Sequence, residues 1–517
     1  MSKSIEKIVI VGGGSAGWMT AATLISQFPT KQILLIESPD IPIIGVGEST
    51  VGGIRGWLNL VGISDADFMA HTDAVYKLAI KFTDFYKKQS GSWYYPFGHP
   101  SINQEEWYIK KAVFPKTETE DFAFSCYPQM SFIESNTFSK RNLKDLHPWN
   151  IDHTAFHFDA VKFACWLKEN FCCKKGVQHI INEIVNIEIN ETGIQNLCLA
   201  NGELIHADLF IDCTGFKSLL LEGALKVPFK SYEDILPNNR AWATRMPYRD
   251  RSQQLTLFTE CTAIDNGWVW NIPLWNRIGT GYVYNDKFIS PENAKEEFIN
   301  FLKISDNNLN QIEFKDIQIK SGTHERYWEK NVVAIGLSAA FVEPLESTGL
   351  VTVHDWAIAL CRTLGRGAVN QWDIDEYNSS CLDEFEYWAQ FVAMHYALSH
   401  RDDTEYWRYV TEKSNYKMRQ SLSNLQSQQL FQQTMYSRRF KKEFGADYGI
   451  HCLTAGMNYN PIDIFMLKKE FPPNHDLQKE FFYILNKHTD LKKQYKKAIS
   501  QSSLDLESFY KTNFNRE

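Results

Sequence analysis

Short apolar runs and helical stretches alternate at the start of the chain. Residues 8–11 (IVIV) form a continuous apolar run that leads directly into three glycines. Residues 19–25 have helical composition, and residues 32–36 (QILLI) form a second apolar run that ends in Glu37. Short continuous apolar runs bounded by turn residues are typical of buried strands. The pattern therefore predicts a strand–helix–strand unit.

The later apolar segments predict further strands and then helices. Residues 331–336 (NVVAIG) have the composition of a buried parallel strand, and a helix is expected to follow at about 351–364. From about residue 355 onward the pattern is mainly helical. Other strands are predicted at 180–189, 194–200, 207–212, 241–246, 255–259, 267–273 and 277–284, the last two pairing as a hairpin.

Residues 75–82 (VYKLAIKF) alternate in polarity and predict one strand with Lys77 and Lys81 on the same face. By itself this pattern favours a surface strand with two solvated lysines. A helix is expected from Phe156 to Leu167, where Asp159 is placed to cap the first turn or to satisfy local backbone donors.

Composition narrows the class of protein. The chain has 517 residues, of which 44% are hydrophobic and 22% charged, as in a soluble globular protein. A net charge of −8 gives no electrostatic footprint for nucleic acid. No segment has the ~18 uninterrupted apolar residues of a membrane span, and the first apolar run is interpreted as a strand rather than a signal peptide. Ten scattered cysteines without a C-x-x-C pair predict reduced thiols, a cytoplasmic location and no metal site.

The glycines after the first strand predict a nucleotide site. Gly12, Gly14 and Gly17 fit G-x-G-x-x-G, in which the glycines allow a tight turn, backbone approach to a pyrophosphate and close helix–strand packing. The helix start that follows offers N–H groups to the phosphates. Glu37 lies about 20 residues further on, where an acid accepts a ribose hydroxyl. The alternative is that these glycines serve packing only.

Three later motifs bear on which kind of cofactor the predicted nucleotide site binds. Residues 45–50 (GVGEST) suggest a loop that passes close to something bulky. The late strand ends at Gly336 before a helix, the form that returns the chain to the pyrophosphate and ring of a flavin. Residues 268–273 (WVWNIP) carry two tryptophans, which on their own fit core packing equally well.

Taken together, these residues resemble the flavin-dependent halogenases of the tryptophan-halogenase type. The resemblance rests on GGGSAGWM at 12–19, GVGEST at 45–50, Lys77, WVWNIP at 268–273 and EPLESTG at 343–349, in order over most of residues 1–365. It implies an α/β (α+β) fold: a Rossmann-like FAD-binding domain of the flavin monooxygenase type with a β-rich middle and a helical C-terminal substrate region. We expect residues 1–365 to form the FAD-binding body, with an insert at about 75–330, and residues 366–517 to cover the substrate.

The chemistry implied by the resemblance is halogenation. FADH2, O2 and a halide yield hypohalous acid, which travels through a tunnel to an electron-rich aromatic or indole-type substrate. Lys77 is implied to be catalytic, either by hydrogen bonding hypohalous acid or as a haloamine. Glu346 is its implied partner, which orients the electrophile or takes the ring proton, whereas Lys81 is ranked as a surface residue.

The remaining implied contacts fall into three sets. The backbone of Thr348 and Gly349 is expected to bind the halide. The flavin is expected to be shielded from the substrate by Trp268, Trp270, Ile272 and Pro273. The expected FAD contacts are Gly12, Gly14, Ser15, Ala16, Gly17, Glu37, Gly45, Val46, Gly47, Glu48, Ser49, Thr50, Gly336, Leu337, Ser347 and Leu350.

The sequence also departs from tryptophan-specific members of the family. Those members carry a histidine before Pro-Phe, where this chain has Tyr95, and residues 445–453 do not reproduce their aromatic clamp and acid. The sequence therefore does not establish free tryptophan as the substrate, and an indole, a phenol or another electron-rich aromatic stays open. No second nucleotide fingerprint is present, so a separate NAD(P)H-dependent flavin reductase is expected, with the enzyme a monomer or homodimer. The alternatives are a flavin monooxygenase without halide chemistry and a non-enzymatic flavin-binding regulator.

Overall fold

The computed structural model of the chain describes most of its residues. They are 5–40, 48–98, 100, 122–139, 154–304, 309–420, 448–459, 479, 483, 486, 490, 493, 494, 496–501 and 503–516. The predicted FAD contacts Gly45, Val46 and Gly47, and residues 445–447 of the predicted substrate region, lie outside this set.

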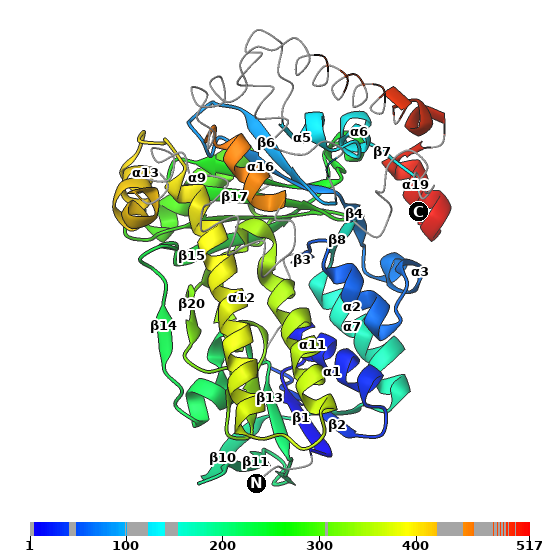
Figure 1. Ribbon diagram of the computed structural model, residues 1–517, viewed down its shortest axis with the longest axis vertical. Coiled ribbons are helices and arrows are strands. Elements are labelled where there is room, and N and C mark those ends of the chain that lie inside the picture. Colours follow the sequence, from blue (N-terminus) through cyan, green and yellow to red (C-terminus); the bar gives the residue numbers. More distant parts are fainter. Residues whose placement is uncertain are drawn as a thin grey trace.

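A six-stranded sheet forms one half of the molecule (Figure 1). Its order is β21-β22-β13-β1-β2-β9, and all neighbours are parallel except β21 and β22. The strands are β1 (Lys7–Val11), β2 (Gln32–Glu37), β9 (Gln178–Ile181), β13 (Leu209–Asp212), β21 (Trp328–Glu329) and β22 (Val332–Ala334). The helices α1 (Ser15–Gln27) and α11 (Val351–Gly365) pack against each other beside it. The predicted parallel sheet, α/β class and late helix are confirmed.

A seven-stranded sheet forms the second half. Its order is β19-β15-β18-β17-β16-β5-β6, antiparallel except for the parallel pair β16 and β5. The strands are β5 (Ala79–Thr83), β6 (Ser92–Pro96), β15 (Arg240–Met246), β16 (Phe258–Ile264), β17 (Gly267–Pro273), β18 (Ile278–Tyr284) and β19 (Lys315–Gln318). The predicted hairpin of β17 and β18 is confirmed, whereas the strand expected at 255–259 lies further along the chain as β16.

The chain changes sheets at Leu78, so the prediction of one strand at 75–82 is wrong. Residues before it form β4 (Val75–Lys77), which pairs with β8 (Ala155–Phe158), whereas β5 joins the seven-stranded sheet. The Leu78 N–H donates to the Leu257 carbonyl and its own carbonyl accepts from the Phe97 N–H. Polarity alternates equally in one strand and in two consecutive strands, so the pattern could not reveal this switch.

Two further predicted boundaries differ in the structure. The strand expected at 180–189 is two strands in different sheets, β9 and β10 (Ile184–Asn190), and β10 forms a hairpin with β11 (Gly193–Leu199). The helix expected from Phe156 begins later, because β8 precedes α7 (Ala160–Trp166). Asp159 caps α7 as predicted, accepting from two backbone N–H groups of its first turn.

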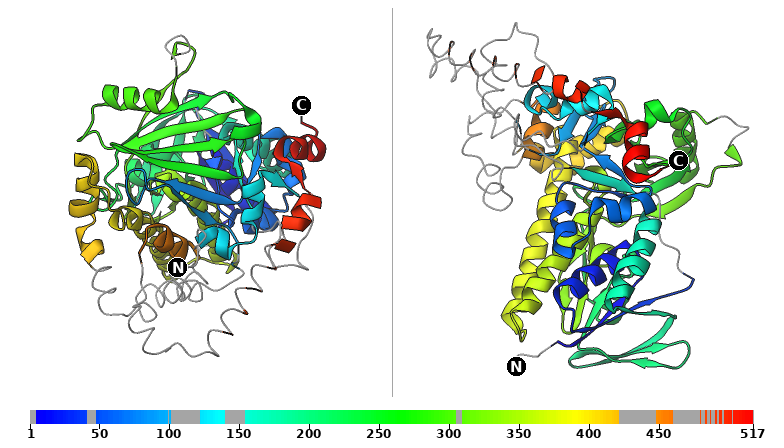
Figure 2. Two further views of the ribbon diagram at one scale, coloured as in Figure 1. Left: turned by 90° about the horizontal axis from the view of Figure 1, so that it is seen from above. Right: turned by 90° about the vertical axis from the view of Figure 1, so that its right-hand side faces the viewer.

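The C-terminal part packs along both halves. The 27-residue helix α12 (Gln371–Ala397) lies against α11 and runs from the six-stranded sheet to the seven-stranded sheet (Figure 1). The short helices α16 (Tyr448–Gly456) and α5 (Phe122–Cys126) lie on β6, at the opposite end of the molecule from the β10–β11 hairpin (Figure 2). None of the described helices is long and apolar enough to cross a membrane.

Candidate active site

The glycine-rich turn after β1 is packed closely on two sides and open on a third. A Cβ on Gly12, whose φ is +115°, would lie 2.2 Å from the Cys213 carbonyl oxygen. A Cβ on Gly17 would lie 1.9 Å from the Gly12 carbonyl oxygen, so only glycine lets α1 approach the strand. Nothing lies within 4 Å of a Cβ built on Gly14. This open space beside the N-terminus of α1 fits a pyrophosphate.

The ends of β2 and β22 meet the same turn. Glu37 reaches back over it, since its Oε2 lies 1.6 Å from where a Cβ on Gly13 would be, and its Oε1 lies 2.7 Å from His179 Nε2. Gly336, with a φ of +79°, approaches α1 so closely that its Cβ would lie 3.0 Å from the Cβ of Ala16. Three strand ends therefore converge on the helix start, as the sites of dinucleotide cofactors require.

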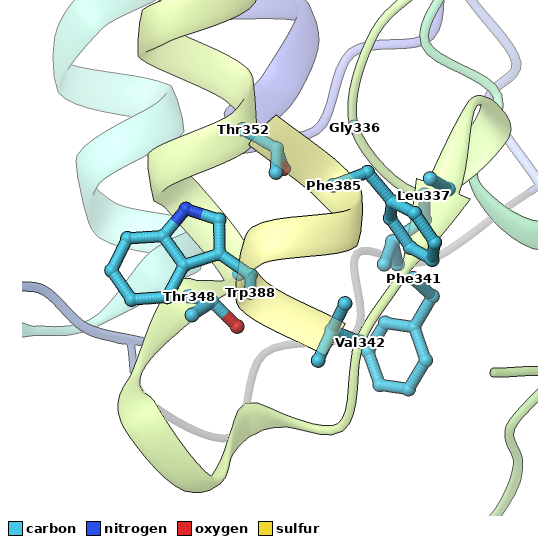
Figure 3. A pocket seen from close by; sticks show the side chains of 10 residues that line it. Gly336, Leu337, Phe341, Val342, Thr348, Thr352, Phe385 and Trp388 are labelled. Atoms are coloured by element: carbon cyan, nitrogen blue, oxygen red, sulfur yellow. The ribbon is translucent and has the colours of Figure 1, made fainter. Parts of the chain in front are cut away.

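A pocket lies next to this edge (Figure 3). In the figure, Trp388 and Phe385 project from α12, and Trp388 lies beside Thr348. The lining is largely apolar and aromatic, the chemistry that sites for planar ring systems share. The lining residues are Gly336, Leu337, Ala340, Phe341, Val342, Thr348, Gly349, Thr352, Phe385 and Trp388.

The GVGEST motif ends beside the turn that carries the predicted halide contacts. Glu48 and Ser49 form the short strand β3, which pairs with β8. The Oε2 of Glu48 lies 4.0 Å from where a Cβ on Gly349 would be, and burial raises the pKa of Glu48 to about 7. Gly349 belongs to the 3₁₀ turn Thr348–Leu350, which runs directly into α11.

Lys77 is fully buried at the end of β4. Its Nζ donates hydrogen bonds to the Thr50 carbonyl oxygen and to the Ser347 Oγ, both at 2.8 Å, and lies 4.9 Å from the centre of the Phe97 ring. Burial lowers the pKa of Lys77 from 10.5 to about 7. Because the two acceptors occupy two positions of the tetrahedral nitrogen, an ammonium presents a third N–H and a neutral amine presents its lone pair. Both forms are accessible near neutral pH.

A chain of three hydroxyls leads away from Lys77. The Ser347 Oγ lies 3.0 Å from Ser49 Oγ, which lies 2.7 Å from Thr259 Oγ1, which lies 2.8 Å from His157 Nε2. Lys77 donates to Ser347, which donates to Ser49. If the same direction continues through Thr259, the chain ends on an unprotonated His157 Nε2. Burial and the charge of Lys77 hold the pKa of His157 well below its usual value.

The two carboxylates of the EPLESTG motif differ in their surroundings. Glu343 Oε2 accepts hydrogen bonds from Asn238 Nδ2, Tyr396 Oη and Trp268 Nε1 at 2.8, 2.7 and 3.1 Å. Burial raises its pKa, which these hydrogen bonds oppose. Glu343 thereby joins the EPLESTG motif to the WVWNIP motif.

Glu346 is also buried, and burial raises its pKa, against the opposing effects of His395 and Lys77. Its Oε1 lies 2.9 Å from His395 Nε2, the distance of an ion pair, but neither carboxylate oxygen has a partner among the described residues with the geometry of a hydrogen bond. The neighbouring Ser347, predicted as an FAD contact, hydrogen bonds Lys77 in this structure. Glu346 and Lys77 therefore belong to one site.

Lys81 lies outside this site. Its Nζ forms an ion pair with Glu260 at 2.8 Å, and its side chain is 23% exposed. The strand break at Leu78 thus separates a buried lysine from a partly exposed one.

The tryptophans of the WVWNIP motif lie on one face of β17 with ring centres 6.1 Å apart. Gly281 on β18 makes room for Trp270, because a Cβ there would lie 2.1 Å from the Trp270 ring. All four predicted barrier residues, Trp268, Trp270, Ile272 and Pro273, are buried. None of the four lines the pocket of Figure 3, and Trp268 Nε1 donates a hydrogen bond to Glu343 Oε2.

Sequence analysis missed three residues that the structure brings to this region. Glu343 was visible only as part of its motif, and Phe97 only as part of an aromatic segment. His395 lies in an apolar helical run (FVAMHYA), where the histidine was the single polar signal. Within the described ranges, no group of three or more His, Cys, Asp or Glu side chains could hold a metal ion.

Known proteins share both the sequence and the fold. The profile of the family described as "Tryptophan halogenase" matches residues 7–472. The chain is 34% identical over 430 residues to the 7-chloro-L-tryptophan 6-halogenase KtzR of a Kutzneria species, covering 78% of this chain and 81% of that protein. It is 33% identical over 429 residues to the tryptophan 7-halogenase RebH of Lentzea aerocolonigenes, covering 79% of each.

A solved structure of the tryptophan 6-halogenase SttH of Streptomyces toxytricini superposes with a TM-score of 0.83 at 30% identity, covering 98% of this chain and 99% of that one. The match over nearly the whole length includes both sheets and the C-terminal helices. The chain therefore belongs to the tryptophan halogenase family and is an enzyme of the flavin-dependent halogenase type.

Proposed function

We propose that this enzyme uses FADH2, O2 and a halide to form hypohalous acid, and uses Lys77 to deliver it to an electron-rich aromatic or indole-type substrate. The observation that carries the proposal is the buried Lys77, which is held by one residue of GVGEST and one of EPLESTG. A lysine kept fully out of water and tied to two motifs of the cofactor side has no role in packing alone.

FAD is the cofactor that the cradle fits. The open space at Gly14 and the start of α1 hold the pyrophosphate, and Glu37 takes a ribose hydroxyl. The ring lies along the pocket of Gly336, Leu337 and the turn before α11. When bound and reduced, the flavin supplies the oxidant that converts halide to hypohalous acid. A separate flavin reductase supplies the reduced form.

The backbone N–H groups of Thr348 and Gly349 bind the halide beside the ring. The carboxyl of Glu48 lies close to this turn, and a neutral carboxyl there avoids repulsion of an anion. Trp268, Trp270, Ile272 and Pro273 form the wall that keeps an organic substrate away from the flavin. Water excluded from this interior also protects the hypohalous acid.

Lys77 and Glu346 act on the electrophile and the substrate. The third position of the Lys77 nitrogen either donates a hydrogen bond that polarises hypohalous acid or takes the halogen as a haloamine. Glu346 accepts the proton that the aromatic ring loses. Both side chains are buried, so bulk water does not compete for hydrogen bonds with either group.

The substrate differs from free tryptophan in this proposal. Tyr95 packs edge-on against Phe97 and Phe391. A Cβ on Gly449 of α16 would lie 2.9 Å from the ring of Tyr95, so Tyr95 fills space under the C-terminal region.

We place the boundary between the FAD-binding body and the substrate-covering region at residue 365. The first helix beyond it, α12, contributes both Phe391 near Tyr95 and Trp388 in the cofactor pocket.

The test is incubation with a flavin reductase, FAD, NADH and chloride, bromide or iodide, over a panel of indoles, phenols and tryptophan, analysed by mass spectrometry. We expect halogenated product from at least one indole or phenol and its loss in Lys77→Ala. Lys81→Ala is the matched control, four residues away and partly exposed, and should retain activity. Hydroxylated product that forms without halide, or full activity in Lys77→Ala, contradicts the proposal and favours a flavin monooxygenase.

A further inference from the structure

His395 lies against Glu346 in a site from which water is excluded. Both side chains are buried, and His395 Nε2 lies 2.9 Å from Glu346 Oε1. The other ring nitrogen, Nδ1, lies 3.2 Å from the carbonyl oxygen of Phe391, one turn earlier in α12. A carbonyl oxygen only accepts hydrogen bonds, so Nδ1 must carry a hydrogen for this contact to be favourable.

Counting hydrogens then leaves two arrangements for the pair. With Nδ1 protonated, Nε2 either carries a second hydrogen and faces a carboxylate, or offers a lone pair to a carboxylic acid. The first is an imidazolium–carboxylate pair and the second a neutral pair. A neutral ring with its hydrogen on Nε2 would place a lone pair against the Phe391 carbonyl, which is unfavourable.

Aromatic rings and a second carboxyl group surround His395. The ring of Trp93 lies nearly parallel to the imidazole at 5.8 Å and an interplanar angle of 24°, and the Phe82 ring lies at 4.9 Å. Aromatic faces stabilise a cation above them. The carboxyl of Glu343 also interacts with His395 through its charge.

Other charged groups face Glu346 directly. Lys77 favours its ionised form, and the thiol of Cys261 lies close enough for its pKa to be raised by burial and by Glu346. Among the described residues, His395 and Lys77 are the titratable groups that lower the pKa of Glu346. Two potential cations, Lys77 and His395, thus flank one carboxyl group.

We propose that His395 is a positioning residue that holds Glu346 as a carboxylate, so that this carboxylate can take the proton of the substrate ring. The inference rests on the proposed role of Glu346. After the halogen adds, the ring carbon bears both hydrogen and halogen and the ring is a cation. The C–H bond breaks, its electron pair restores the aromatic ring, and the proton passes to the Glu346 carboxylate. The hydroxide left from hypohalous acid finally takes that proton, so that the products are haloarene and water.

The first experiment measures protonation without turnover. We would label the histidine rings with ¹⁵N in the full chain and identify the His395 signals as those lost in His395→Gln. At pH 7.5 both His395 nitrogens should carry hydrogen in the wild type and in Glu346→Asp, which keeps the carboxylate. In Glu346→Gln the ring should become neutral. A neutral His395 in the wild type from pH 6 to 9, or no change in Glu346→Gln, overturns the proposal.

The second experiment separates this inference from the proposed function. Halogenation of indole and tryptophan and trapping of hypohalous acid would be measured in Glu346→Gln, His395→Gln and the double variant. Positioned bases contribute roughly 10²–10⁴-fold. We therefore expect the yield of halogenated product to fall at least about tenfold in each variant. The double variant should lose no more activity than Glu346→Gln. The amount of hypohalous acid that is trapped should be the same in all variants as in the wild type.

His400→Gln is the control, since His400 also contacts a backbone carbonyl at the end of α12 but lies at the surface. A fully active Glu346→Gln contradicts the proposed function itself. An impaired Glu346→Gln together with a fully active His395→Gln contradicts only the role of His395.

Discussion

Replacing Lys77 with methionine tests the buried charge on which the proposed chemistry depends. Methionine has nearly the same length and cannot be charged. Burial lowers the pKa of Lys77 from 10.5 to about 7, and at about 1.4 kcal/mol per pH unit this corresponds to about 5 kcal/mol. The methionine variant avoids that cost and loses only the hydrogen bonds to Thr50 and Ser347.

The sign follows from proton binding. Below pH 7 the lysine is charged in both the folded and the unfolded chain, so the wild type bears the full cost of burying the charge. As the pH rises from 7 towards 10.5, the folded protein releases the proton while the unfolded chain keeps it. The stability of the wild type therefore increases relative to the variant by up to about 5 kcal/mol over this interval.

The measurement is the midpoint of urea unfolding, followed by tryptophan fluorescence at several pH values between 6 and 10.5, for the wild type and Lys77→Met. The difference between them should be largest below pH 7 in favour of the variant and should shrink as the pH rises. Lys81→Met controls for loss of a lysine that is partly exposed. A wild-type-to-variant difference that stays constant from pH 6 to 10.5 refutes the reasoning.

Three further changes have defined outcomes. Gly14→Ala should leave the melting temperature of the FAD-free protein unchanged but weaken FAD binding measured by flavin fluorescence, because the added methyl enters open space; unchanged binding would place the pyrophosphate elsewhere. Gly281→Ala drives a Cβ into Trp270 and should destabilise the protein by about 1–3 kcal/mol, seen as a lower melting temperature. Asp159→Ala removes the cap of α7 and the ion pair with Arg277 at 2.7 Å, and should cost about 1–2 kcal/mol in the same assay. If the melting temperature is unaffected in either of the last two, the contact in question does not contribute to stability.

The features that sequence predicted are those decided within a few neighbouring residues. Glycines 12, 14 and 17, the apolar strands beside them and the cap at Asp159 depend on local geometry, which spacing and residue type specify. The family and the α/β class follow from several such motifs occurring in order.

The features that sequence did not predict depend on contacts between distant segments. The strand switch at Leu78 leaves the alternation of apolar residues unchanged, so no pattern marked it. His395 meets Glu346 only because α12 folds back along α11, and a histidine in an apolar helix resembles a core residue. Ser49, Ser347 and Thr259 come from three separate motifs or strands, so their hydroxyl chain exists only in the folded molecule.

The switch at Leu78 divides the strand that carries Lys77 from the strands that lead to Tyr95, which lies in the proposed substrate region. Lys77 is anchored by β8 and the cofactor side, whereas β5 carries β6 and, on it, Tyr95 and the helix α16. Substitutions on β6 and α16 can therefore change the surroundings of Tyr95 without moving the Lys77 nitrogen. Such an arrangement would let new aromatic substrates be accepted, in evolution or in the laboratory, by changing one side of a single peptide link while the halogenating apparatus on the other side stays in place.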